Sequence, residues 1–131
     1  MNPIGHLSGD PSEQIRMMLV RIRNIALRLF DLRADAIAYG LDFYIDPLLD
    51  NASNIKDSLQ RTRDFLSNYG YLSWDDRRGS IPAFVSSINN LIEQVNGLEQ
   101  SIRDARAAAH SASTSKRSAS PGSRRRGSGN K

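Results

Sequence analysis

Apolar residues recur at alternating steps of three and four between Pro11 and Tyr39, and this spacing constrains the fold more than any other feature of the chain. Such a repeat forms one apolar seam along a long helix, like the a and d positions of a coiled coil. Asp10 and Pro11 are typical of a helix start, and Glu13 stands where a capping box has its acid. Gly40 weakens the helix without having to end it, so we expect it to continue to about residue 45. The seam residues are Ile15, Met18, Ile22, Ile25, Leu29, Leu32, Ala36 and Tyr39.

The same repeat returns twice farther along the chain. Asp46 and Pro47 form a helix boundary, because a residue before proline avoids the helical conformation and aspartate is a good N-cap. Gly70 is a natural residue to follow the second helix, and Pro82 lies in the first turn of the third. The seams of these two helices include Leu59, Leu66, Ile88, Leu91, Val95, Leu98 and Ile102. The sequence therefore predicts an all-α protein with three helices, at about 11–45, 47–69 and 81–109.

Three helices with apolar seams have two ways to bury them. Within one chain they form a small antiparallel bundle, and between chains they form a coiled-coil oligomer. The first two helices could also be a single rod kinked at Pro47. Further apolar residues, such as Leu19, Phe30 and Phe65, lie beside the seams, and a face this wide serves more than one neighbour. We therefore expect self-association or docking onto another helical protein.

The segments before and between the helices are less regular. Residues 1–9 are short and polar, and we predict a flexible N-terminal arm ahead of a helical domain at 10–110. Residues 71–80 are expected to be a connecting loop that contains the single tryptophan, Trp74. That side chain either covers the end of the helices as an apolar plug or forms an aromatic and basic patch for a partner.

The C-terminal segment, residues 111–131, has a different composition. It holds six of the 18 basic residues of the chain, whereas all 14 acidic residues lie before it. It has no apolar residue larger than alanine, so we predict a disordered tail. The basic residues of the tail are Lys116, Arg117, Arg124, Arg125, Arg126 and Lys131. Clusters of this kind bind phosphate backbones without sequence specificity, which predicts RNA or DNA as a partner; a nuclear localisation signal or a solubilising tail are the other interpretations.

Two serines in the tail stand three residues after an arginine, as in many kinase sites. They are Ser120, which follows Arg117, and Ser128, which follows Arg125. Each phosphate adds about two negative charges. Phosphorylation of both serines would cancel most of the positive charge of the tail, and we expect it to weaken nucleic-acid binding.

The first helix carries a second basic stripe. Its residues are Arg16, Arg21, Arg23 and Arg28, and no acidic residue lies between Glu13 and Asp31. The stripe is either a solvated helix flank that pairs with acids on another helix or a second face for phosphate contacts.

No pattern in the sequence is typical of an enzyme. The chain has no cysteine, which excludes disulfides and thiolate chemistry, and its two histidines, His6 and His110, lie near opposite ends. It has no P-loop and no glycine-rich dinucleotide motif. We therefore expect a protein without catalytic activity, cofactor, metal or small-molecule substrate. Its apolar runs are too short for a membrane span, which needs about 20 residues, and its start does not resemble a signal peptide.

These features together predict a small helical oligomerisation or adaptor protein whose basic tail binds nucleic acid. Virion-associated proteins and nucleoprotein assembly factors share this layout, and we expect the protein in the cytoplasm, the nucleus or a virion. The alternative is a coiled-coil subunit of a hetero-oligomeric complex of the tethering, cytoskeletal or kinetochore type. In that case the phosphorylatable tail would be regulatory only.

Overall fold

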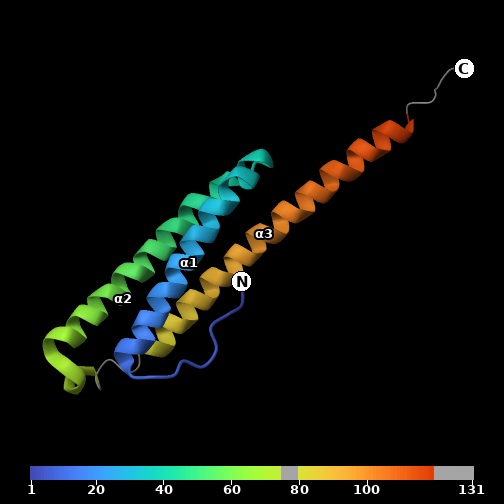
Figure 1. Cartoon of the computed structure of the whole chain (residues 1–131). Helices are drawn as coiled ribbons and strands as arrows, with labels where there is room; N and C mark the ends of the chain where they lie inside the picture. Colours follow the sequence, from blue (N-terminus) through green and yellow to red (C-terminus); the bar gives the residue numbers. More distant parts are fainter. Residues whose placement is uncertain (75–79, 120–131) are drawn as a thin grey trace, which may run out of the picture.

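The computed structural model describes the backbone of residues 1–74 and 80–119, and the side chains of residues 1–68 and 81–112. The described chain is all-helical, as predicted, and contains no β-strand. Figure 1 shows the order of the elements along the chain. They are α1 at Pro11–Ala38, the short 3-10 helix η1 at Asp42–Tyr44, α2 at Ile45–Trp74 and α3 at Ser80–Ala119.

α1 begins with the cap that the sequence predicts. The Asp10 side chain accepts a hydrogen bond from the backbone N–H of Glu13 at 2.8 Å, and Pro11 is the first helical residue. The Glu13 carboxylate does not return to the cap, since it accepts from the guanidinium of Arg16 one turn farther on. The capping box is therefore half formed, and its acid instead neutralises the first arginine of the basic stripe.

α1 ends at Ala38, earlier than the expected end near residue 45. Gly40 has a φ of +71°, a left-handed conformation that glycine adopts without strain. The N–H of Leu41 donates to the carbonyl of Ala36 at 2.8 Å, and the N–H of Gly40 donates to Ile37 at 3.2 Å. These two bonds form a Schellman motif, so Gly40 stops the helix rather than weakening it.

α2 begins within a few residues of that stop and runs back beside α1, so the first two helices are not one kinked rod. Pro47 lies in its first turn, as expected. The helix passes through Gly70 and ends at Trp74, which corrects the predicted end at residue 69. A glycine inside a helix costs only about 1 kcal/mol, which a helix of 30 residues can offset. The predicted plug or patch at Trp74 lies outside the described side chains.

α3 is the longest element, with 40 residues. It continues past the predicted end at residue 109, because the sequence after it has alanine, serine and lysine but no glycine or proline before Pro121. The start of the predicted tail is therefore helical up to Ala119, and residues 120–131 lie outside the described residues. In Figure 1 the first part of α3 lies against the α1–α2 pair, and its later part extends beyond the turn between them.

The three helices share one apolar core, and each helix contacts the other two. Every seam residue named above for these helices is buried, except Tyr39, which is half-buried. Ile45, Leu48, Ala52, Ile55 and Ile92 add to the same core. The three seams therefore face one another within a single chain.

The N-terminal arm lies along α3, and its flexibility remains a prediction. Its backbone is hydrogen-bonded to the side chains of Asn89 and Asn96. Met1, Ile4 and Leu7 are partly buried and pack against the core. The arm contacts the helices because its few apolar residues are spaced to reach them, although its overall composition is polar.

Candidate protein-binding surface

α1 has a second apolar face in addition to its buried seam. Large side chains on that face are solvent-exposed: Val20, Leu27, Phe30 and Ile37 are 48%, 51%, 56% and 58% exposed. They form two pairs with a spacing of seven residues, which places each pair along one line of the helix. We call these four residues the outer face of α1. The seam of α1 is buried against α2 and α3, whereas the outer face stays exposed and is not covered by any described part of the chain.

One edge of the outer face borders a groove between α1 and α2. The groove has a volume of about 560 Å³. It is hollow because Ala26, Ala52 and Ser53 are short where the two helices face each other. Phe30 and Leu49 provide apolar walls, and the full lining is Ile22, Arg23, Ala26, Phe30, Leu49, Asp50, Ala52, Ser53 and Lys56. An apolar groove with cationic groups at its rim can hold the apolar side of another helix.

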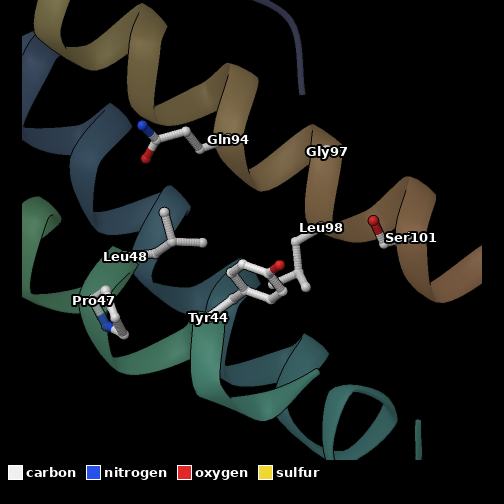
Figure 2. A pocket seen from close by; sticks show the side chains of 7 residues that line it. All are labelled: Tyr44, Pro47, Leu48, Gln94, Gly97, Leu98 and Ser101. Carbon is white, nitrogen blue, oxygen red and sulfur yellow. The ribbon is translucent and has the colours of Figure 1, made fainter. Parts of the chain in front are cut away.

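A second groove lies between the start of α2 and α3, and has a volume of about 470 Å³. Figure 2 shows Tyr44, Pro47 and Leu48 on one side and Gln94, Gly97, Leu98 and Ser101 on the other. Gly97 leaves room on the α3 side, since a Cβ atom placed there would meet no atom within 4 Å. The ring of Tyr44 also packs against Phe43, with ring centroids 4.1 Å apart. Phe43 is 63% exposed, so an aromatic pair marks the turn between α1 and α2.

Two of the four arginines in the basic stripe of α1 are neutralised by ion pairs. Arg16 pairs with Glu13, and Arg28 pairs with Glu99 of α3 with 2.5 Å between nitrogen and oxygen. Arg21 and Arg23 form no ion pair within the described part of the chain, and the Nε atom of Arg21 is buried without a hydrogen-bond partner there. The stripe is therefore not one continuous positive surface, and its residues divide between ion pairs inside the molecule and two separate cations.

Glu99 is the one acidic side chain buried in the described core. The hydrogen bond from Arg28 holds its pKa below the ordinary value, and burial opposes that shift. Its second oxygen, Oε1, is buried without a hydrogen-bond partner among the described residues. The pair ties α1 to α3, and a second pair, Asp35 with Arg106 at 3.1 Å, ties them farther along.

The structure describes only the beginning of the proposed nucleic-acid site. Lys116 and Arg117 lie on the last turns of α3, and their side chains lie outside the described ones. Arg124, Arg125, Arg126, Lys131 and the two candidate phosphoserines, Ser120 and Ser128, lie outside the described residues altogether. The helix that leads to them points away from the body formed by α1 and α2 (Figure 1).

Neither a metal site nor a membrane-spanning helix is found in the described residues. No three histidine, cysteine, aspartate or glutamate side chains there are placed to hold a metal ion. None of the helices, over their described residues, is long and apolar enough to cross a bilayer.

Sequence reasoning missed two features of these surfaces. Of the outer face of α1, only Phe30 is among the residues predicted to widen the seam, although the spacing of seven is visible in the sequence. The roles of Asn89 and Asn96 were missed, although two asparagines seven residues apart lie on one side of a helix. The sequence matches no protein-family model, and no curated protein or solved structure is significantly similar to it.

Proposed function

We propose that this chain is a non-enzymatic assembly protein. Its helical body associates with a second copy or with a helical partner, and its basic tail binds RNA or DNA without sequence specificity. The observation that supports association most directly is the outer face of α1. Large apolar side chains that stay exposed after the core has formed are typical of interaction sites.

The spacing of the outer face fits a helix as the partner. Val20 and Leu27, like Phe30 and Ile37, stand one heptad apart. A helix laid along α1 would repeat its contacts at the same interval, as in a coiled coil. The groove beside Phe30 would take the side chains at one edge of such a helix. Contact between chains would thus use a different face of α1 from the contact within the chain.

The length of α3 supports a separate role for the tail. A helix of 40 residues is about 60 Å long, and its basic end lies beyond the turn between α1 and α2. The tail could then contact phosphates without covering the outer face. Assembly would bring several tails together, and several weak phosphate contacts act with increased avidity. Phosphorylation at Ser120 and Ser128 would oppose this binding.

The neutralised arginines favour the division of roles between body and tail. Arg16 and Arg28 are engaged by Glu13 and Glu99, which leaves Arg21 and Arg23 as the unpaired cations of the stripe in the described part of the chain. The stripe thus offers phosphate fewer cations than the six basic residues of the tail. The same observation is compatible with the alternative function, a coiled-coil subunit of a hetero-oligomeric complex with a regulatory tail. The two functions differ in whether the purified chain self-associates and whether it binds nucleic acid.

Light scattering of the full-length chain, with and without a single-stranded RNA, separates these functions. We expect a concentration-dependent oligomer that becomes smaller in the double variant Leu27→Asp/Phe30→Asp, because two charges would be buried in the contact. Asn54→Asp on the exposed side of α2 is the matched control and should leave the oligomer unchanged. Thermal unfolding followed by circular dichroism should show that all three proteins are folded. If the wild-type chain stayed monomeric and did not bind the RNA, the result would favour the alternative, a subunit of a hetero-oligomeric complex.

A further inference from the structure

The N-terminal arm is bound by α3 in an unusual way, through two asparagine side chains that each contact one residue of the arm twice. The amino group of Met1 donates to Oδ1 of Asn96 at 2.6 Å, and Nδ2 of Asn96 donates to the carbonyl of Met1 at 2.8 Å. The N–H of Ile4 donates to Oδ1 of Asn89 at 2.6 Å, and Nδ2 of Asn89 returns to the carbonyl of Ile4 at 3.2 Å. Each amide thus binds the main chain as a neighbouring β-strand would, with one donor and one acceptor.

The spacing of these contacts has a simple geometric basis. Asn89 and Asn96 are seven residues apart, which is about 10.5 Å along a helix. Met1 and Ile4 are three residues apart, which is about 10 Å along an extended chain. The two repeats therefore match, with the arm running in the opposite direction to α3. The hydrogen bonds of this strip of α3 therefore recognise an extended main chain.

The apolar residues of the arm add a second requirement. Met1, Ile4 and Leu7 occur at every third position, and all three are partly buried against the core. Pro3, between the two anchored residues, lies beside Ile92 and Glu93 of α3. We call the strip of α3 at Asn89, Ile92, Glu93 and Asn96 the arm site. It fits an extended peptide with an apolar side chain at every third position.

The arm joins α1 through Gly9, which has a left-handed φ of +98°. The carbonyl of Gly9 accepts a hydrogen bond from Nε2 of Gln14 at 3.1 Å, so this joint is held by α1 and not by α3. The seam residues pack against one another without contributions from this joint. The arm can therefore leave the arm site while the helices keep their core.

We propose that the arm site is a peptide-binding site and that its partner from outside the chain is the N-terminal arm of a second copy. The arm of another copy has the same sequence and so fits the site as well as the chain's own arm does. Exchange of identical segments between copies is a low-cost way to form a dimer. This contact is separate from the outer face of α1, and it does not depend on the assembly proposed there.

A pair of complementary variants tests the exchange. In the acceptor, Ile4→Asp/Leu7→Asp removes the arm from its site and leaves the site intact. In the donor, Asn89→Ala/Asn96→Ala destroys the site and leaves a free, intact arm. Both full-length chains also carry Leu27→Asp/Phe30→Asp, so that the outer face cannot contribute. Circular dichroism melts establish that each variant is folded.

We expect equal amounts of donor and acceptor to form a one-to-one heterodimer, detected by native mass spectrometry, that neither forms alone. The matched control is a donor with Asn90→Ala; Asn90 lines the same hollow as Pro3 but has no hydrogen bond to the arm among the described contacts, so this variant isolates the hydrogen bonds of Asn89 and Asn96. It keeps its arm in place and should give several-fold less heterodimer. Equal heterodimer with both donors, or none with either, would overturn the proposal. If only the outer face failed in the earlier test, the heterodimer would still form.

A labelled peptide of residues 1–9 provides a second measurement. We expect its fluorescence anisotropy to saturate on titration with the acceptor chain, and the affinity to fall at least tenfold when the acceptor also carries Asn96→Ala. A peptide with Ile4→Asp should not bind. If binding did not saturate, or if Asn96→Ala left the affinity unchanged, the arm site would hold only the arm of its own chain and the proposal would be wrong.

Discussion

The ion pair of Arg28 and Glu99 joins α1 to α3 at the edge of the core. The Glu99 side chain is 11% exposed and the Arg28 side chain 44%, so the acid is buried and the base is half in solvent. Removing the base would leave a buried carboxylate with no partner among the described residues. Breaking a fully buried pair costs about 3–5 kcal/mol, and the exposure of Arg28 reduces this to about 1–2 kcal/mol. We expect Arg28→Met to lower the free energy of unfolding by that amount in urea titrations at neutral pH. Arg16→Met, which breaks the exposed pair with Glu13, is the control and should have little measurable effect.

The same pair predicts a pH dependence. The hydrogen bond from Arg28 lowers the pKa of Glu99 in the folded protein, and the unfolded chain has the ordinary value. A folded-state pKa below the unfolded one stabilises the protein above the unfolded pKa, and the stabilisation is lost as the pH falls through the folded pKa. The difference in unfolding free energy between wild type and Arg28→Met should therefore shrink in acid, below the ordinary glutamate range. In a Glu99→Gln background there is no carboxyl group to titrate, so the effect of Arg28→Met should no longer depend on pH in this way. If the difference between wild type and Arg28→Met persisted at low pH, the ion pair would not be its origin.

At the scale of helices, the glycines show which features could be predicted from sequence. The seams were predictable because apolar spacing is a property of the sequence alone. The helix ends were not, because Gly40 ends α1 with a left-handed φ while Gly70 and Gly97 lie inside helices. The residue type is the same in both cases, so the sequence alone does not show whether a given glycine ends a helix or lies inside one. The path of the arm was not predictable for a similar reason. It depends on Asn89 and Asn96, which bind the main chain of the arm but lie more than 80 residues away in the sequence.

Alanine substitutions distinguish the two kinds of glycine. Gly40→Ala forces a side chain into the left-handed conformation of the Schellman motif, and we expect it to cost about 1 kcal/mol. Gly97→Ala adds a Cβ atom where no atom lies within 4 Å, in the interior of α3, and should stabilise the protein by up to about 1 kcal/mol. Urea unfolding of both variants beside wild type measures the two effects. If both substitutions lowered the free energy of unfolding, Gly97 would have a close contact that the described structure lacks.

At the scale of the whole molecule, the length of α3 separates the proposed protein-binding surfaces of the helical body from the basic tail. The core, the outer face and the arm site all belong to the three-helix body, where Arg16, Arg28 and Arg33 of α1 are paired with acids. The later part of α3 leaves that body and leads to residues 120–131, where four of the basic residues lie (Figure 1). Substitutions should therefore alter the proposed nucleic-acid binding of the tail and the proposed protein binding of the body independently of each other.

That independence predicts how salt should affect RNA binding. Each phosphate neutralised on a single strand contributes about 0.7 to the slope of log affinity against log salt concentration. Arg124→Gln/Arg125→Gln/Arg126→Gln should therefore reduce the slope by about two, because three cations are lost. Arg16→Gln/Arg23→Gln on α1 removes cations from the predicted secondary face and should change the slope much less, since Arg16 is already paired with Glu13 and Arg23 alone could contribute at most about 0.7. Affinities for a single-stranded RNA measured by fluorescence anisotropy across a salt series give both slopes. If the α1 variant lost as much slope as the tail variant, the body would take part in phosphate contact and the division of roles would be wrong.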